Sequence, residues 1–210
     1  MSVDQRGAVS RTVVVVSSTN DLSLGEWAVL GLVAEGETHG FAVSRAFAPD
    51  GVIGRIWTIP RPLVYRAIAS LQTSGYVRET GSVPGVHGPE RRLIGLTPAG
   101  RAALDSWLGE PVAHVRDARS ELLVKLLLLD RAGLDTRELL DAQAERIRPM
   151  LVGLCEKLAR AEGFDATLAR WRLASAEALA NFLAELIDDR LSHGVPVPPG
   201  EGETELPERH

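Results

Sequence analysis

Between Pro60 and Gly75 the sequence places two arginines and a tyrosine where they could bind an anion. Arg61, Tyr65 and Arg66 lie within six positions of each other, and guanidinium and phenol groups donate hydrogen bonds to phosphate oxygens and base edges. The stretch 61–101 holds six arginines and two glutamates, a net charge of +4 in a chain whose formal net charge is −5. Nucleic acid could meet such a patch, although many solvated protein faces carry similar charge.

A helix from Pro60 to Ser74 is predicted to position these side chains. Prolines are tolerated in a first helical turn, and Gly75 provides a left-handed stop. At about 100° per residue, one side gathers the apolar residues and should face the core. The other side should be free to touch DNA, unless Tyr65 packs on the helix edge and Arg66 is merely solvated. Its candidate contacts are Arg61, Pro62, Tyr65, Arg66, Ser70 and Thr73.

Two helices are expected before this segment. Ser23 and Glu26 have the spacing of a capping box, which starts a first helix ending near Gly36. Thr38 is expected to cap a short second helix that ends before Pro49, with apolar side chains in the core. His39 is expected at a helix start for structural reasons.

A hairpin and a fourth helix should follow. The alternating runs 76–80 and 91–96 flank a Gly/Pro-rich loop of ten residues, which indicates two strands and an exposed tip. Thr97 then caps the fourth helix. Alternation predicts that only one of the two strand arginines contacts DNA. The hairpin candidates are His87, an ordinary solvent-exposed loop histidine on the alternative interpretation, and Arg91 and Arg92.

The order helix, helix, helix, hairpin, helix predicts a winged helix-turn-helix domain over residues 21–110. The chain resembles PadR-type transcriptional regulators, and this implies DNA binding, with Tyr65 touching the backbone. It departs from the family pattern at Ile94-Gly95, where an aromatic and a polar or basic residue are common. The similar segments are Leu24–Val33, Thr38–Phe41, Ile56–Ile68, Leu71–Val77, Arg91–Leu93 and Leu96–Gly100.

Residues 111–192 are predicted to form a helical dimerisation module. Helices are expected at 119–130, 135–161 and 165–191, and the last carries a long apolar stripe that one chain should not cover alone. The alternative is that these helices fold back on the winged domain of the same monomer. Residues 1–20 and 193–210 are expected to be disordered tails. The candidate dimer contacts are Leu168, Trp171, Leu179, Phe182, Leu183 and Leu186.

Composition argues against an enzyme or a membrane protein. Hydrophobic residues make up 45% and charged residues 24%, as in ordinary soluble proteins, and no apolar run approaches the roughly 18 residues of a spanning helix. The apolar block 13–16 is too short for a secretory signal, which indicates a cytoplasmic protein. The single cysteine and the spacing of the five histidines predict no disulfide, metal or cofactor.

The sequence therefore predicts a mostly α-helical fold: three helices, a two-stranded wing and a linking helix, followed by a helical dimerisation module. The expected function is a repressor that binds a pseudo-palindromic site in double-stranded DNA as a homodimer. The resemblance implies relief by a small aromatic or hydrophobic effector, for which Trp27, Trp107 or Trp171 could line a pocket. The alternative is a protein-interaction or signal-binding module without specific DNA binding, because Arg61 and Arg66 are the only cations on the third helix.

Overall fold

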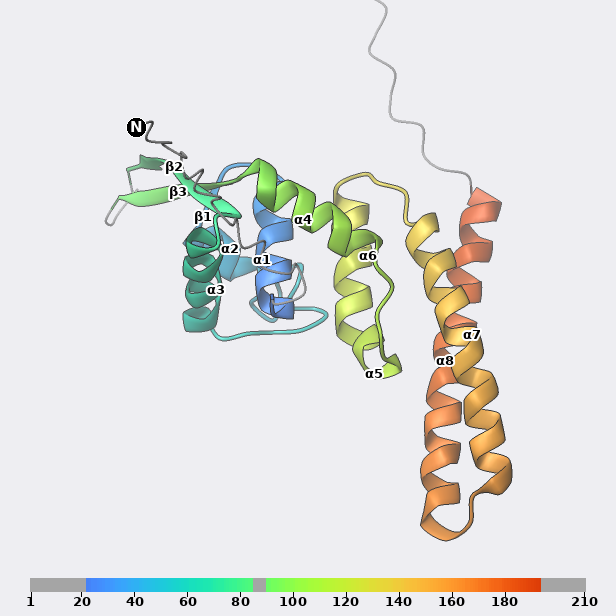
Figure 1. Ribbon diagram of the computed structural model, residues 1–210. Helices are drawn as coiled ribbons and strands as arrows, with labels where there is room; N and C mark the ends of the chain where they lie inside the picture. The colour runs from blue at the N-terminus through green and yellow to red at the C-terminus, as the bar shows by residue number, and fades with distance from the viewer. Residues whose placement is uncertain (1–21, 85–89, 194–210) are drawn as a thin grey trace, which may run out of the picture.

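The computed structural model describes residues 22–84 and 90–193, and it confirms the mostly helical fold class. A winged domain and a long helical hairpin are joined by a central helix (Figure 1). The winged domain contains α1 Leu24–Ala34, β1 Thr38–His39, α2 Gly40–Ala46, α3 Arg61–Thr73, β2 Val77–Val83, β3 Arg91–Leu96 and α4 Pro98–Gly109. The remainder contains α5 Val115–Asp117, the π-helical turn η2 Ala118–Leu122, α6 Leu123–Arg131, α7 Arg137–Arg160 and α8 Gly163–His193.

The predicted tails lie outside the described residues, except that α8 extends to His193. No described helix is both long and apolar enough to cross a lipid bilayer.

Helix α1 begins with the predicted capping box. The Ser23 hydroxyl accepts from the Glu26 amide at 3.3 Å, and the Glu26 carboxylate accepts from the Ser23 amide at 2.7 Å. Burial alone would raise the pKa of Glu26, but hydrogen bonds from Ser23 and Ser70 outweigh it and leave the pKa below its usual value. The helix is buried around most of its circumference, which makes it the centre of the winged domain.

The second helix begins differently from the prediction. Thr38 does not cap it, because Thr38 and His39 pair with Ile94 and Leu93 as a short strand. The sheet therefore has three strands in the order β1-β3-β2 rather than two. The cap of α2 is His39, whose Nδ1 accepts from the Ala42 amide at 3.0 Å. This confirms the structural role expected for His39.

Two backbone hydrogen bonds shape the turn between α2 and α3. The Ile53 and Gly54 amides both donate to the Ala46 carbonyl, at 2.9 and 3.0 Å. A Cβ on Gly54 would lie 1.7 Å from the Ala48 carbonyl oxygen, so this turn admits only glycine. The compact turn returns the chain to the start of α3, with the Ile53 side chain fully buried.

The wing contains a bulge opposite its unusual glycine. Pairing between β2 and β3 shifts between Glu79 and Gly81, so Thr80 is the extra residue. A Cβ on Gly95 would lie 2.9 Å from the Thr80 methyl group. The glycine in Ile94-Gly95 therefore fits the bulged strand, where a larger residue would crowd Thr80.

An aromatic stack joins the winged domain to the central helix. The rings of Trp27 and Trp107 stack with centroids 5.1 Å apart, and the Lys125 ammonium lies 4.7 Å from the Trp107 centroid. Lys125 is almost fully buried, donates to the Glu110 carbonyl at 2.6 Å and pairs with Glu121 at 3.0 Å. Trp27 and Trp107 are thus buried core residues, and a role for them in an effector pocket stays a prediction.

Lys125 should make the free energy of unfolding depend on pH in the alkaline range. Burial lowers its pKa, and the hydrogen bond and charge of Glu121 only partly offset this. The unfolded chain therefore holds this proton more tightly than the folded protein, and the free energy of unfolding should rise as pH increases toward the ordinary lysine pKa. Urea unfolding at neutral pH and at about pH 9.5 should show the rise, and Lys125→Met should reduce it. Lys157→Met, at an exposed lysine of α7, should not; an equal rise in both variants would contradict this assignment.

The central helix runs from Val115 to Arg131, with a π turn in its middle, and starts earlier than the predicted helix at 119–130. Its first part contacts α8, and α6 packs on α1. There the Leu128 side chain occupies the space beside Gly31, 2.3 Å from where a Cβ would lie. The helix therefore contacts both parts of the molecule.

Helices α7 and α8 pair along their length as a hairpin that extends beyond the winged domain (Figure 1). The N-cap residue of α7 is Thr136, and the Asp135 carboxylate accepts from the Arg137 amide at 2.9 Å. Buried Gln143 fastens the hairpin to the segment after α4. Its side chain accepts from the Val112 amide at 2.7 Å and donates to the Val112 carbonyl at 3.3 Å.

Candidate nucleic-acid interface

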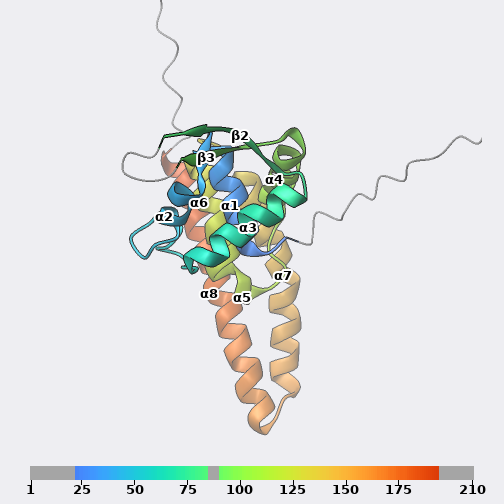
Figure 2. The same cartoon turned by 90° about the vertical axis from the view of Figure 1, so that its left-hand side faces the viewer.

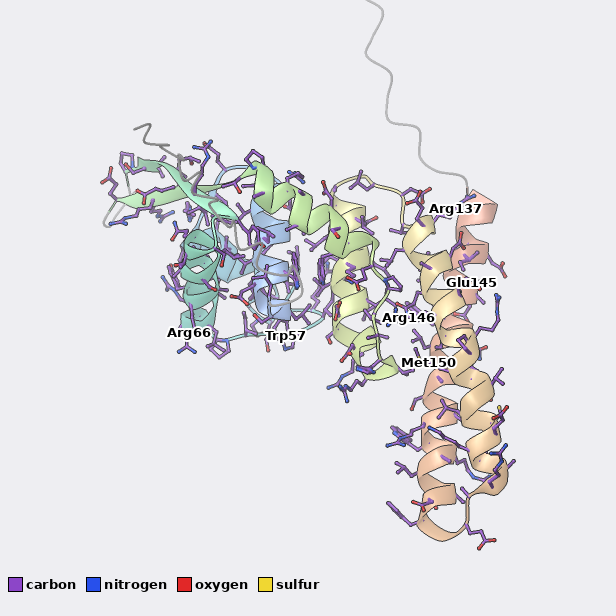
Figure 3. The ribbon with its side chains drawn as sticks, viewed as in Figure 1. Trp57, Arg66, Arg137, Glu145, Arg146 and Met150 are labelled. Carbon is purple, nitrogen blue, oxygen red and sulfur yellow. The ribbon has the colours of Figure 1, made fainter. Side chains whose placement is uncertain are left out.

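Helix α3 lies on the outer face of the winged domain, with the wing beside it (Figure 2). Its inner side is buried, and Arg61, Pro62, Tyr65, Arg66 and Thr73 are exposed on its outer side. Arg66 projects outward from the helix (Figure 3). The inner side consists of Val64, Ala67, Ile68 and Leu71, as the helical period predicts.

Two of the predicted hydroxyl contacts are partly engaged within the protein. Ser70 is half-buried and hydrogen-bonds the Glu26 carboxylate. Thr73 donates to the Ala69 carbonyl at 2.9 Å. Both hydroxyls satisfy internal groups, so Arg61, Tyr65 and Arg66 are the side chains of α3 best placed to meet a ligand.

Aromatic rings hold two arginines beside the start of α3. Arg61 donates to the Tyr65 hydroxyl at 3.2 Å, and its guanidinium carbon lies 5.4 Å from that ring's centroid. Arg61 and Arg91 lie 5.3 and 5.5 Å from the centroid of Phe41, within the range of cation–π attraction. The Tyr65 ring itself fills the space beside Gly40, 2.7 Å from where a Cβ would lie. The Tyr65 ring thus packs on α2 while the side chain stays 41% exposed. Its contact with DNA stays a prediction.

Sequence reasoning missed Phe41, which was assigned to the core. Its side chain is 43% exposed, because α2 turns it toward α3 and the wing rather than inward. The only signal in the sequence is an aromatic residue next to the glycine that accommodates Tyr65.

The two arginines of the wing make different contacts, as strand alternation predicts. Arg91 lies over Phe41, whereas Arg92 pairs with Glu79 at 3.5 Å on an exposed surface. His87 falls in 85–89, outside the described residues. A groove of about 720 Å³ separates the wing from α2 and α3, and it is lined by His39, Phe41, Arg61, Tyr65, Arg91 and Arg92, together with Glu79 and Glu90.

The proposed dimer contacts on α8 divide into three groups by exposure. Leu179 and Leu183 are buried within the single chain, so they do not form a free surface as predicted; packing between α7 and α8 covers them. Leu168, Phe182 and Leu186 are half-buried. Trp171 is 70% exposed, and it is the candidate contact that remains most open to a partner.

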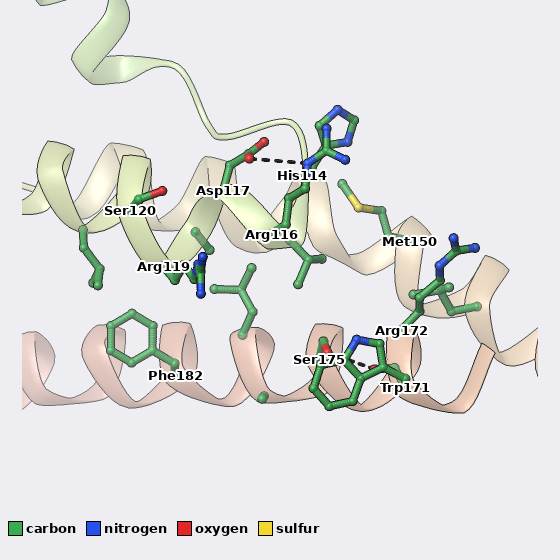
Figure 4. Close-up of a pocket in the computed structure, with 16 residues that line it drawn as sticks. His114, Arg116, Asp117, Arg119, Ser120, Met150, Trp171, Arg172, Ser175 and Phe182 are labelled. Atoms are coloured by element: carbon green, nitrogen blue, oxygen red, sulfur yellow. Dashed lines mark hydrogen bonds and ion pairs between the residues drawn. The ribbon is translucent and has the colours of Figure 1, made fainter. Parts of the chain in front are cut away.

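A second groove, of about 1060 Å³, lies between the first part of the central helix and the α7/α8 hairpin (Figure 4). Its apolar surface comes mainly from Trp171, Phe182, Met150 and Leu154. Its charged lining consists of Arg116, Arg119, Arg172 and Asp117. Of the three tryptophans considered for an effector pocket, only Trp171 borders a described groove.

The fold and this surface define a winged helix-turn-helix protein with an attached helical hairpin. Residues 29–106 match the model of the transcriptional regulator PadR-like family. This segment is therefore a PadR-like domain, which confirms the resemblance seen in the sequence. The family is one of transcriptional regulators and not of enzymes.

Individual relatives agree with this assignment. A probable transcriptional regulator of Mycobacterium tuberculosis is 30% identical over 97 residues, covering 46% of this chain and 49% of the relative. The negative transcriptional regulator PadR of Bacillus subtilis is 25% identical over 100 residues, covering 48% and 53%. The chain thus spans about half the length of the curated relatives it matches.

Two solved structures are also similar. Bacillus subtilis PadR in complex with operator DNA aligns with a TM-score of 0.41 at 19% identity, over 80% of this chain and 99% of that chain. A PadR-like regulator from Bacillus cereus aligns with a TM-score of 0.37 at 18% identity, over 82% and 99%.

Proposed function

We propose that this protein is a transcriptional repressor that binds double-stranded DNA, with α3 entering the major groove. The observation that carries the proposal is the outward face of α3, where Arg61, Tyr65 and Arg66 are exposed beside the wing arginines of a PadR-like domain. A helix of this shape fits the major groove, and arginines beside it supply backbone contacts that fix its register. Because a bacterial-type regulator binds its operator DNA in the cytoplasm, we place the protein there.

A homodimer would present two such helices to a pseudo-palindromic operator. Support comes from the α7/α8 hairpin, which extends beyond the winged domain and exposes Phe164 and Trp171 at 79% and 70%. Large exposed apolar side chains are typical of surfaces that a partner covers. Two-fold symmetry then sets the half-sites about one helical turn apart.

The groove beside Trp171 is our candidate site for an effector. Its apolar lining and three arginines suit a small aromatic or hydrophobic compound, including one that carries an acidic group. It lies between the hairpin and the central helix that reaches the winged domain. A ligand bound there could therefore change the position of the α7/α8 hairpin relative to the winged domain and so relieve repression.

Replacing Arg61 and Arg66 with alanine should weaken binding to the DNA that flanks the coding region, by about tenfold for each arginine. Both side chains are exposed, so stability should change little. Binding of labelled duplexes at several salt concentrations measures the effect, and footprinting should show two protected half-sites. Arg45→Ala is the matched control, since Arg45 is exposed and pairs with Asp50 at 3.6 Å.

Unchanged affinity in the Arg61 and Arg66 variants would count against DNA binding by this face. The alternative function, an interaction or signal-binding module, is favoured by the sparse charge of α3. It predicts no sequence-selective protection of genomic fragments at low or moderate salt. Protection of a defined site would exclude it.

A further inference from the structure

Two hydrogen-bond donors face each other at the edge of the groove between the wing and α2. Nδ1 of His39 accepts from the Ala42 amide, so the hydrogen-bond network assigns the ring proton to Nε2. That Nε2 lies 3.4 Å from Nη1 of Arg91, and a guanidinium nitrogen can only donate. The two groups cannot bond to each other. An oxygen that accepts from both would satisfy both.

A second pair of hydrogen-bond donors, Arg61 and Tyr65, lies at the start of α3, beside the Phe41 ring. The Tyr65 hydroxyl oxygen accepts from Arg61 at 3.2 Å, which leaves the phenolic proton free to be donated outward. The Arg61 and Arg91 guanidinium carbons both lie within 5.5 Å of the Phe41 centroid. One exposed ring therefore holds two positive charges near each other.

The acidic groups nearby are engaged elsewhere. The Glu90 carboxylate accepts from the Ser82 hydroxyl, and Glu79 pairs with Arg92. Within residues 22–84 and 90–193, no carboxylate forms an ion pair with Arg61 or Arg91. The two arginines are thus held in place by rings rather than neutralised, which leaves their charge available to an anion.

We propose that these groups form a phosphate clamp for one strand of the DNA backbone. One phosphate accepts from His39 and Arg91, and its neighbour accepts from Arg61 and Tyr65. Phe41 is a positioning residue, because its ring holds both guanidiniums before DNA arrives. Phosphate suits the site because its oxygens only accept hydrogen bonds and carry the opposite charge. The clamp rests on the proposed DNA binding, and it adds His39 and Phe41 to the interface.

Two variants separate the clamp from folding. His39→Asn keeps an oxygen that can cap α2 but removes the Nε2 donor, and it should weaken binding about fivefold. Phe41→Leu keeps an apolar side chain but frees both arginines, and it should weaken binding roughly tenfold through the cost of ordering them. The probe is a mixed-sequence duplex of about three helical turns, because phosphate contacts do not depend on sequence. Leu134→Ala, at an exposed apolar side chain between α6 and α7, should bind as the unchanged protein does.

The salt dependence of DNA binding and the replacement of single phosphates provide two further measurements. Neither should change if these residues only support the fold. Arg91→Gln should make the slope of log K against log salt shallower by about 0.9, the effect of one lost phosphate contact. A methylphosphonate scan of the footprinted site, where the register of the protein is fixed, should find one position where neutralising the phosphate weakens the unchanged protein but not His39→Asn. If the effects of the methylphosphonate and of His39→Asn do not add, His39 contacts that phosphate.

The outcomes distinguish the clamp from the regulator as a whole. If Arg66→Ala weakens binding while the His39, Phe41 and Arg91 variants keep the affinity and salt slope of the unchanged protein, the clamp is wrong and the regulator stands. If the unchanged protein shows no salt-dependent binding to duplex DNA, both proposals fail. If His39→Asn does not fold, the Arg91→Gln slope decides, since Arg91 is exposed and caps no helix.

Discussion

Gln143→Leu should lower the free energy of unfolding by about 3 kcal/mol. The side chain of Gln143 satisfies both backbone groups of buried Val112, at 2.7 and 3.3 Å. Leucine would fill similar space but leave a buried amide and a buried carbonyl without partners, each at a cost of about 1 to 3 kcal/mol. Urea unfolding followed by circular dichroism would measure the loss.

Glu145→Gln is the matched control for this variant. Glu145 lies two residues further along α7 and pairs with Arg148, and both side chains are 68% exposed. An exposed pair of this kind contributes little, so the stability should stay within about 0.5 kcal/mol. If Gln143→Leu were as stable as this control, Val112 would have to find other partners, and the hairpin would not depend on this contact.

Gly54→Ala should also lower the free energy of unfolding by about 3 kcal/mol or more. The new methyl group would lie 1.7 Å from the Ala48 carbonyl oxygen and 2.6 Å from its carbon. These are backbone atoms, and the turn around them is fixed by hydrogen bonds to the Ala46 carbonyl. The clash can therefore be relieved only by moving the segment that leads into α3, so DNA binding should fall with stability. Thermal unfolding and duplex binding would measure the two effects.

Gly109→Ala tests whether the loss comes from the clash rather than from the change of residue. A Cβ at Gly109 meets nothing within 4 Å. Because alanine restricts the unfolded chain and favours helix, stability should stay the same or rise by about 0.5 to 1 kcal/mol. Equal losses at both positions would show that the turn tolerates a side chain.

Helix α3 could be predicted because its signals are local. Prolines at its first turn, an apolar period of 3.6 and a terminal glycine all lie within α3 or next to it, and Gly75 adopts a φ of 75°. The Ser23 capping box was predictable for the same reason. Each of these features depends on residues a few positions apart, whose geometry the backbone largely determines.

Contacts between distant segments could not be predicted in this way. Thr38 was expected to cap α2, but its pairing with Ile94, more than fifty residues away, draws it into the sheet. Phe41 was placed in the core, although arginines from α3 and the wing lie against its ring. In both cases the partner is distant in sequence, and helical periodicity carries no information about it.

The apolar stripe of α8 shows a related limit. Its period correctly indicated a surface to be covered, but it could not say by which element. Helix α7 covers Leu179 and Leu183 within the same chain and leaves Trp171 open. The predicted dimer surface included residues that are buried within the single chain. The dimer stays a proposal, and it now rests on the smaller set of residues that remain exposed.

The π turn at 118–122 fixes the rotational phase between the two halves of the molecule. Such a turn accommodates one more residue than regular winding, and each residue of an α-helix advances the chain by about 100°. Deleting one residue there would restore regular winding and leave the two ends of the central helix near their present phase. Deleting one residue from α6, where the winding is regular, would instead rotate the winged domain by about 100° about the helix axis. In the proposed dimer, such a deletion in α6 would turn the two α3 helices away from a common duplex, whereas the deletion in the π turn would leave them in place.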